Sequence, residues 1–390
     1  MIYINQEGML VIKSWCNEPE EGAIEQARNL AKLPFAFRQV CLMPDTHQGY
    51  GMPIGGVLAT KNVVIPNAVG VDIGCGMGAV KTSLTEIDTE SLKKIMGLIR
   101  EKIPVGMTHH KEKQDRYSVP DFTPIDYTYG YVVQEEFNKS LYSIGTLGGG
   151  NHFIEIQKGD DGFIWFMVHS GSRNLGKKVA DYYNRVAVEL NEKYYSKVPK
   201  EWQLAFLPLD TDNGQYYVEE MNYCVRYAYL NRNLMMERIQ LSFIEVTGEV
   251  GFSPLINIAH NYVRMEHHFN ENVMVHRKGA TSARKGEVGI IPGSQGTNSY
   301  IVEGLGNEDS FTSCSHGAGR KMGRKEAQRS LNLEEEKLKL EQSGIIHSVR
   351  TEKDLDEASG AYKSIDIVME EQKDLVKPLI KLKPLAVIKG

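Results

Sequence analysis

The order of apolar and polar positions along the chain predicts short strands mixed with a few long helices. Apolar residues recur at helical spacing over 92–103, after the N-cap candidate Asp88 and before Pro104, so we expect a helix there. Residues 152–156 (HFIEI) and 163–169 (FIWFMVH) flank a KGDDG turn, which is typical of two paired strands.

The pattern changes in the middle of the chain. Two segments with helical periodicity, 177–197 and 217–246, predict a helical hairpin within residues 177–250. Short apolar runs then return, and a third long helix is expected over 318–343. Because strands at both ends flank the helices, we expect an α+β fold with mixed or antiparallel sheets. It would form a single domain over 1–390, with the hairpin as an insertion.

Composition narrows the class of protein. The 390 residues are 41% hydrophobic and 24% charged, which is typical of a globular protein with a large core. The net charge of −5 provides no global attraction to nucleic acid, so RNA or DNA binding would need a local basic patch. The five cysteines are scattered without a CxxC pair, and no apolar run is long enough to span a membrane. We therefore expect a cytoplasmic protein.

The stretch VGVDIGCGMG (69–78) places a carboxylate, Asp72, three residues before a thiol, Cys75, on a glycine-rich backbone. One interpretation is a buried cysteine in a tight turn, with Asp72 as its cap. The other is metal ligation, because the glycines let the backbone curl and bring both side chains into one cavity. The two residues alone leave both interpretations open.

Histidines supply the other candidate ligands. Four of the eleven lie at the ends of apolar segments, where sites on α+β scaffolds are commonly built: His152, His169, His260 and His316. A single histidine is more often a satisfied core or surface residue than a ligand. A mixed set of cysteine, histidine and aspartate would suit Mn²⁺, Zn²⁺, Fe²⁺ or Co²⁺.

Glycine clusters at 145–152, 292–299 and 315–320 favour a ligand that carries phosphate, because they expose backbone N–H groups. The last cluster is expected to open the helix over 318–343, whose N-terminus would favour anions. One further stretch, GSRNLGKK (171–178), is similar to a phosphate-binding loop. It has lysine where that loop needs serine or threonine, so we reject it.

Three arginines are suited to bidentate phosphate contacts, namely Arg173, Arg320 and Arg324. Arg320 and Arg324 are four residues apart, so on the expected helix they would share a face.

Taken together, a series of motifs resembles the RtcB family of tRNA-splicing and RNA-repair ligases. The match runs in order from about residue 40 to residue 390 and rests on PDTHQGYGMPIGG, GVDIGCGMGA, GTLGGGNHFIE, VHSGSRNLG, AHNY, PGSQGTNSYIV, SHGAGR and AVIKG. The resemblance implies a GTP-dependent ligase that uses two Mn²⁺ ions. It would join RNA ending in 2′,3′-cyclic phosphate or 3′-phosphate to RNA with a 5′-hydroxyl end, through a GMP–histidine intermediate.

The resemblance also implies roles for individual residues. The family nucleophile maps onto His316, and the metal ligands map onto Asp72, Cys75, His152, His169 and His260, with the cysteine bridging two ions. Guanylate-binding positions map onto Asn151, His152, Phe153, Ile154, Glu155, His260, Asn261, Pro292, Gly293, Ser294, Gln295, Ser299, His316, Gly317, Ala318, Gly319, Tyr362 and Lys389. RNA-phosphate positions map onto Arg173, Arg320 and Arg324.

Three of the guanylate positions have distinct implied roles. Glu155 would accept hydrogen bonds from the guanine edge, Tyr362 would stack on the ring, and Lys389 would close the pocket from the end of the chain. Gln295 departs from the apolar residue expected in many members of the family.

Two other functions remain as alternatives. A metal-dependent phosphoesterase or phosphohydrolase would use the same ions without a covalent histidine, and a non-catalytic RNA- or nucleotide-binding module would use neither. Within the ligase interpretation, the substrate is either tRNA halves or damaged RNA such as ribosomal RNA. An archease-type activator, a release-factor-like partner and a monomeric state are further expectations from the resemblance, and no membrane is expected.

Overall fold

The computed structural model describes residues 1–115, 118–120 and 132–390. The helices are α1 (Glu21–Ala31), α2 (Thr89–Lys102), α3 (Val132–Ser143), α4 (Asn174–Lys193), α5 (Asp212–Thr247), α6 (Arg324–Ser330), α7 (Leu333–Gln342) and α8 (Ile365–Glu371). Short 3₁₀ turns are η1 (Pro66–Ala68), η3 (Lys200–Trp202), η4 (Glu308–Ser310), η5 (Glu352–Glu357) and η6 (Ser359–Ala361). No helix in these ranges combines the length and the apolar character that crossing a membrane requires.

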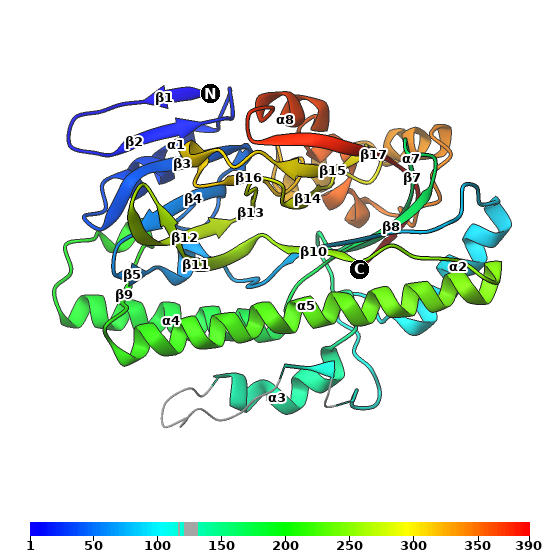
Figure 1. Cartoon of the computed structure of the whole chain (residues 1–390), viewed down its shortest axis with the longest axis horizontal. Coiled ribbons are helices and arrows are strands. Elements are labelled where there is room, and N and C mark those ends of the chain that lie inside the picture. Colours follow the sequence, from blue (N-terminus) through cyan, green and yellow to red (C-terminus); the bar gives the residue numbers. More distant parts are fainter. Residues whose placement is uncertain (116–117, 121–131) are drawn as a thin grey trace.

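One six-stranded sheet is built mainly from the N-terminal part of the chain (Figure 1). Its order is β1 (Ile2–Ile4), β2 (Val11–Ser14), β3 (Ala36–His47), β4 (Ile54–Thr60), β12 (Glu271–Lys278) and β11 (Asn261–His268). Strands β2 and β3 are parallel and the other neighbours are antiparallel, so the sheet is mixed.

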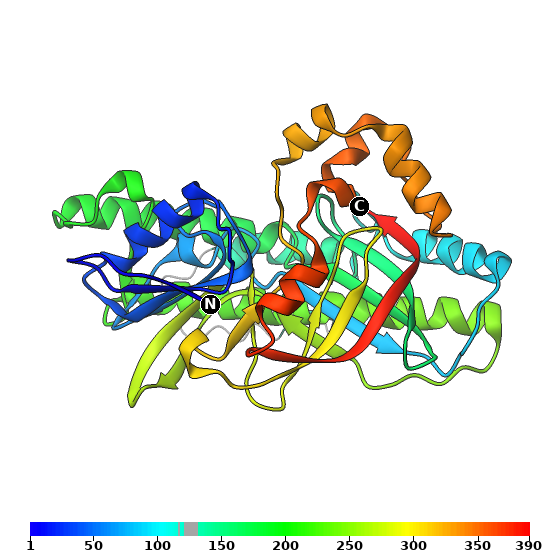
Figure 2. The ribbon, with the colours of Figure 1, turned by 90° about the horizontal axis from the view of Figure 1, so that it is seen from above.

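The second large sheet is antiparallel throughout and combines distant segments. Its order is β10 (Ile256–Ala259), β6 (Gly76–Lys81), β8 (Ile164–Ser170), β7 (Phe153–Gly159), β17 (Val376–Lys389), β15 (Ser299–Gly304) and β14 (Val288–Ile291). Two smaller sheets pair β13 (Ala280–Ser282) with β16 (Ser313–Ser315) and β5 (Val63–Val64) with β9 (Leu207–Pro208). Figure 2 shows the two large sheets beside each other when the molecule is viewed from above. The α+β class with mixed and antiparallel sheets is confirmed.

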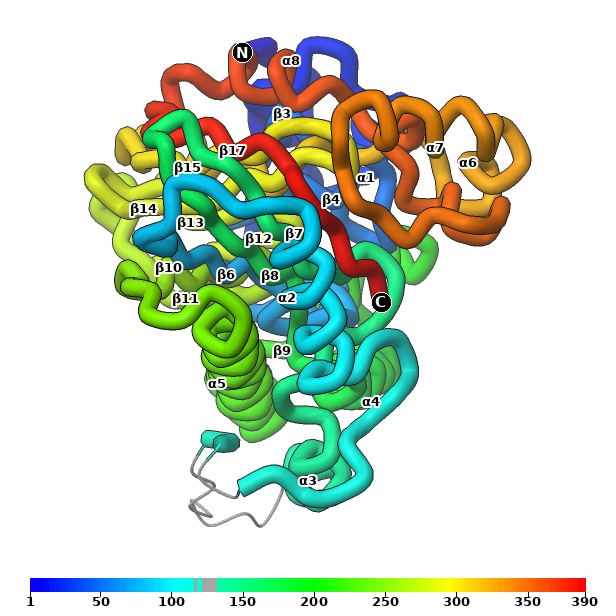
Figure 3. The backbone as a smooth tube through the Cα atoms, turned by 90° about the vertical axis from the view of Figure 1, so that its right-hand side faces the viewer, coloured from blue at the N-terminus to red at the C-terminus, as the bar shows by residue number. Residues whose placement is uncertain are grey.

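Helices α4 and α5 pack together and run along the same side of the sheets (Figures 1 and 3). Helix α5 also packs against α2 and against strands β6, β8 and β10. It begins earlier than the periodicity indicated, because the Thr211 side chain caps it by accepting from the N–H of Gly214. The helix predicted before Pro104 is α2, with Asp88 as its N-cap, and the predicted strand pair is β7 with β8.

The single helix expected over 318–343 is wrong. The chain bends repeatedly after β16, Arg320 forms an isolated bridge with Tyr362, and helix α6 starts only after Gly323. Gly319 explains the difference, because its φ is +72° and a Cβ there would lie 2.3 Å from the backbone oxygen of Asp45. The cluster at 315–320 therefore does not open a helix, and Arg320 and Arg324 do not share a helix face.

Candidate metal centre and adjoining cavities

Four neighbouring strands of the antiparallel sheet end at one edge, and each brings a candidate ligand there. Cys75 precedes β6, His152 precedes β7, His169 lies near the end of β8, and His260 follows β10. The register sets Phe153 opposite His169 and Gly76 opposite Ser170, so the strand ends coincide. Residues far apart in the sequence therefore converge.

The backbone before β6 turns tightly against α5. The N–H of Cys75 donates to the backbone oxygen of Asp72 at 3.1 Å, and Gly74 between them has a φ of +76°. A Cβ at Gly74 would lie 2.9 Å from the Cα of Val225 in α5. Glycine is needed here for both its conformation and its size, and the turn aims the Asp72 and Cys75 side chains at the same place.

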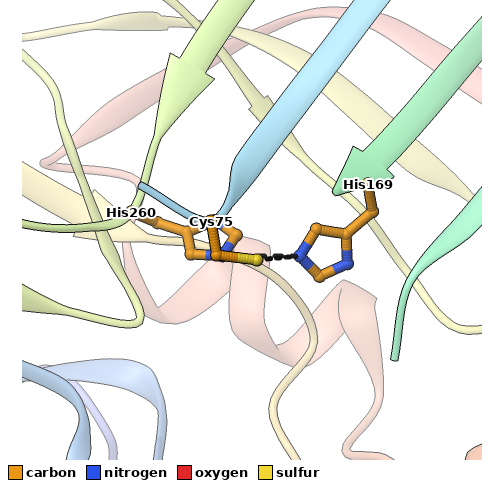
Figure 4. A group of neighbouring side chains, drawn as sticks. All are labelled: Cys75, His169 and His260. Carbon is orange, nitrogen blue, oxygen red and sulfur yellow. Dashed lines mark hydrogen bonds between the residues drawn. The ribbon is translucent and has the colours of Figure 1, made fainter. Parts of the chain in front are cut away.

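The ligand atoms form two overlapping groups. Those of Cys75, His169 and His260 lie within 4.8 Å of one another, and so do those of Asp72, Cys75 and His152. The Cys75 Sγ is 3.2 Å from His169 Nε2 (Figure 4). It is also 3.4 Å from His152 Nε2. The sulfur belongs to both groups and lies between them.

Backbone contacts hold the imidazoles with their Nε2 atoms toward the sulfur. The Nδ1 of His152 lies 3.0 Å from the oxygen of Leu147, and the Nδ1 of His169 lies 3.1 Å from the oxygen of Asn151. A proton on each Nδ1 leaves a lone pair on each Nε2, which is the arrangement of a metal-ligating histidine. The Nδ1 of His260 is buried and has no hydrogen-bond partner among the described residues.

Electrostatics favour uncharged imidazoles. Burial and His152 lower the pKa of His169 well below its ordinary value, and burial and His316 do the same for His260. Burial and the Asp72 carboxylate raise the pKa of the Cys75 thiol well above its ordinary value. Burial alone would raise the pKa of Asp72, but the hydrogen bond and charge of His152 hold it below its ordinary value. Neutral imidazoles at His169 and His260, the carboxylate of Asp72 and a thiol that a cation would ionise fit a divalent metal.

His316 lies beside this cluster and is oriented by a buried carboxylate. Its ring centroid is 4.7 Å from that of His260. Asp45 in β3 is fully buried, and its Oδ2 lies 2.6 Å from His316 Nδ1 and accepts from the backbone N–H groups of His316 and Gly317. With the proton on Nδ1, the Nε2 of His316 is free to act as a nucleophile. Asp45 is not among the residues predicted from the sequence, although it lies in the PDTHQGYGMPIGG motif.

A cavity of about 1010 Å³, which we call the guanylate-side cavity, extends from His316 toward the end of the chain. Predicted guanylate positions line it, namely Asn151, Phe153, Glu155, Pro292, Gly293, Ser294, Gln295, His316, Gly317, Ala318, Gly319, Tyr362 and Lys389. Other predicted positions lie elsewhere. His152, His260 and Asn261 belong to the metal side, the Ile154 side chain packs in the core, and the Ser299 Oγ accepts from the N–H of Gly293.

Glu155 is the chemically distinctive residue of this cavity. Its side chain is 2% exposed, and its Oε1 has no hydrogen-bond partner among the described residues. Burial raises the pKa of Glu155 well above its ordinary value, against the effects of Gln157 and Lys389. A buried acceptor without a partner is costly unless a ligand satisfies it, so Glu155 indicates a ligand with hydrogen-bond donors.

A second cavity, of about 1230 Å³, opens on the other side of His316. It reaches from Asp72, Cys75 and His260 to the segment around Lys197. His316, Asn151 and Arg324 line both cavities and therefore mark their junction.

Lys278 in the wall of the second cavity was also missed by the sequence analysis. Its Nζ donates to the backbone oxygens of Tyr50 and Asn67. Burial lowers the pKa of Lys278 to about 7.

The three predicted phosphate-binding arginines have different surroundings. Arg320 and Arg324 line the guanylate-side cavity and both bind the buried carboxylate of Glu357. Arg173 lies behind the metal cluster instead, where its Nε donates to Thr146 and an Nη donates to the oxygen of Leu147. Arg173 also has a φ of +58°, a strained conformation for a residue with a side chain.

Comparison with known proteins shows the family of this chain. The family model described as tRNA-splicing ligase RtcB matches residues 26–390. The RNA-splicing ligase RtcB of Escherichia coli (strain K12) is 38% identical, over 97% of each chain. The tRNA-splicing ligases RtcB of Thermococcus kodakarensis and Archaeoglobus fulgidus are 30% and 32% identical, over 95% of this chain and 92% of theirs. This chain therefore belongs to the RtcB family of RNA-splicing ligases.

Proposed function

We propose that this chain is a GTP- and Mn²⁺-dependent RNA ligase that joins 2′,3′-cyclic phosphate or 3′-phosphate ends to 5′-hydroxyl ends. The observation that carries the proposal is the position of His316. Its ring is fixed by Asp45, lies 4.7 Å from that of His260, and stands where the two cavities meet. A nucleophile between a nucleotide cavity and a metal cluster suits nucleotidyl transfer.

The first step is transfer of GMP to His316. The Nε2 of His316 attacks the α-phosphorus of GTP, a P–N bond forms, and pyrophosphate leaves. Asp45 holds the Nδ1 proton throughout, so the imidazole presents a lone pair before the reaction and its developing positive charge is stabilised afterwards. Glu155 would accept from the guanine edge, which would satisfy its unpaired Oε1.

The metal ions would be held by Asp72, Cys75, His152, His169 and His260. Bound Mn²⁺ would supply positive charge that neutralises the phosphates next to His316, and Cys75 contributes to both ligand groups that would hold it. In the later steps water first opens a 2′,3′-cyclic phosphate by breaking its P–O2′ bond, which leaves a 3′-phosphate. That 3′-phosphate takes GMP from His316 as the P–N bond breaks, and the 5′-hydroxyl then displaces GMP to seal the strand. We place this activity in the cytoplasm, since the scattered free cysteines suit a reducing compartment.

Labelling with GTP tests the proposal. The purified protein is incubated with Mn²⁺ and GTP carrying a radioactive α-phosphate, and then with RNA that has 2′,3′-cyclic phosphate and 5′-hydroxyl ends. We expect an acid-labile protein adduct that disappears as RNA is joined. The variant His316→Ala should form no adduct but keep its metal content. An adduct on that variant, or RNA phosphate hydrolysis without any adduct in the unmodified protein, would contradict the proposal and favour a phosphohydrolase.

A further inference from the structure

A single buried carboxylate, that of Glu357 at the end of η5, joins several groups of the guanylate-side cavity. The residue is 3% exposed. Its Oε1 accepts from an Nη of Arg320 at 3.2 Å and from the Nε of Arg324 at 2.9 Å. Its Oε2 accepts from the hydroxyl of Tyr362, and its backbone oxygen accepts from the Nε2 of Gln295. Glu357 therefore holds four predicted site residues from three segments of the chain.

The two arginines are used differently. Arg320 is nearly enclosed, with a side chain that is 15% exposed. Its Nε donates to the oxygen of Met322, one Nη donates to Glu357 and Tyr362, and the other Nη donates to the oxygen of Asp356. All three of its nitrogens therefore have protein partners, and little of this guanidinium is left to bind a phosphate.

Arg324, in contrast, is more exposed and has fewer protein partners. Its side chain is 51% exposed, and only its Nε is held, by Glu357. No hydrogen bond from its two Nη atoms occurs among the described residues. A Cβ at Gly150 would lie 3.1 Å from one of these Nη atoms, and Arg324 lines both cavities. The Nη edge of a guanidinium held only at Nε can bind a phosphate through two parallel hydrogen bonds.

Charge supports the same conclusion. Glu357 and Asp356 face three cations, Arg320, Arg324 and Lys389. Arg324 is the most exposed cation of this group, and its Nη atoms carry no hydrogen bond among the described residues. The Arg324 guanidinium is held at its Nε, so its two Nη groups have a fixed orientation. Such a cation favours an anion with two acceptor oxygens.

We propose that Glu357 is a positioning residue for Arg324. The Glu357 carboxylate binds the Nε of Arg324 and thereby orients the two Nη atoms of Arg324 toward the RNA phosphate at the junction of the cavities. Arg320 then helps to hold the Glu357 carboxylate in place, and of these two arginines only Arg324 contacts the phosphate. The proposal rests on the proposed ligase function, because that function supplies the RNA phosphate.

The test compares Glu357→Gln with Glu352→Gln, a matched change at the exposed start of the same 3₁₀ segment. Binding is measured by fluorescence anisotropy with a single-stranded RNA that ends in a 3′-phosphate. We expect Glu357→Gln to weaken binding about tenfold, which is the loss of one oriented bidentate contact. Glu352→Gln should bind within about twofold of the unmodified protein, the level expected of an exposed residue that makes no phosphate contact.

A double-mutant cycle separates positioning from a general structural role. Arg324→Ala should weaken RNA binding by about tenfold, and adding Glu357→Gln to it should cost less than about twofold more. Arg320→Ala should behave like Glu357→Gln and should likewise lose its effect in the Arg324→Ala background. Additive losses in either pair would overturn the proposal.

Two further measurements keep the proposal falsifiable. If Glu357→Gln is unstable by thermal denaturation, Glu357→Asp takes its place, because it keeps the charge and withdraws it by one methylene. The loss with Glu357→Asp should again vanish in the Arg324→Ala background, and persistence of the loss would overturn the proposal. Failure of the unmodified protein to form the GMP adduct would instead contradict the ligase function, whereas the RNA-binding cycle does not depend on that reaction.

Discussion

The two sides of the site differ in how their charged groups are balanced. On the metal side, ligand atoms of Cys75, His169 and His260 face one another within 4.8 Å, and the buried ammonium of Lys278 donates to backbone oxygens. On the guanylate side, the cations Arg320 and Lys389 face the carboxylate of Glu357. The metal side thus presents lone pairs that await a cation, whereas on the guanylate side cations are already paired with a carboxylate of the protein.

Ligands on the two sides therefore have different effects: a cation stabilises the metal side, whereas a ligand on the guanylate side is recognised by a few unpaired groups. Lone pairs brought together by strand ends cost free energy until a cation occupies the space between them. Internal ion pairs instead fix side chains in place and leave only a few groups for recognition, such as the Oε1 of Glu155 and the Nη atoms of Arg324. We therefore expect changes at the metal ligands to abolish function and changes on the guanylate side to alter specificity.

The largest effect is expected from Cys75→Ala, which removes the atom common to both ligand groups. Bound Mn²⁺, measured by mass spectrometry of the purified protein, should fall by at least half, and RNA joining should fall by roughly 10⁴-fold or more, because several kilocalories of charge stabilisation are lost. The matched control is Cys224→Ala, a cysteine buried in α5 outside the site. Normal metal content in Cys75→Ala would refute the ligand assignment.

Part of the metal side, namely the convergence of its strand ends, could be predicted from the sequence. Residues 152–156 and 163–169 indicated the pairing of β7 with β8, and that register alone brings the starts and ends of those strands together. The glycine-rich turn before β6 likewise indicated that Asp72 and Cys75 could share one cavity, although it left a buried cysteine in a tight turn equally open. Strand ends are local features, and local patterns specify them well.

The remaining parts depend on contacts that no local pattern records. Asp45 and His316 are 271 residues apart, and they meet only because β3 and the loop after β16 pack together. The carboxylate of Glu357 lies more than thirty residues from Arg320 and Arg324, on a 3₁₀ segment without strong periodicity. The expected helix over 318–343 also failed here, since Gly319 and Gly323 interrupt the periodic pattern with backbone conformations that it does not encode.

The second-largest effect is expected from Asp45→Asn, at the boundary between the two sides. The amide keeps the shape of the side chain but loses the charge and permits the wrong imidazole tautomer, so we expect GMP transfer to His316 to slow about 10³-fold. The rate is measured by single-turnover labelling with GTP. Metal content should stay normal, and Asp309→Asn serves as a control at a carboxylate that pairs with Lys13 instead. A loss of metal in Asp45→Asn would mean that Asp45 supports the metal ligands as well as His316, which would contradict the separation of the two sides.

A smaller and more selective effect is expected from Glu155→Gln on the guanylate side. A carboxylate accepts two hydrogen bonds from guanine, whereas an amide donates one and accepts one, which matches adenine. The preference for GTP over ATP in adduct formation should therefore fall by about 100-fold, with metal content unchanged. The measurement is a competition between the two labelled nucleotides. A uniform loss of rate with both nucleotides would show that Glu155 supports the fold and does not read the base.

The smallest effect concerns Lys278 and is measured as stability. Burial lowers the pKa of Lys278 to about 7. Above that pH the folded protein has released a proton that the unfolded chain keeps until near the ordinary lysine pKa. The free energy of unfolding should therefore rise with pH, by about 1 kcal/mol per unit between about pH 7 and pH 9. Below pH 7 both states hold the proton, so this contribution no longer changes.

Lys278→Met isolates that contribution, because methionine has a similar length and no charge. Urea unfolding at several pH values should give a slope that is lower in Lys278→Met than in the unmodified protein by about 1 kcal/mol per pH unit. The matched control is Lys389→Met on the guanylate side, where Glu357 and Asp356 oppose the effect of burial on the lysine pKa. The change in slope should accordingly be smaller there. Equal changes at the two lysines would mean that the two sides carry the same charge balance, since only an ammonium without an acidic partner gives up its proton on folding near neutral pH.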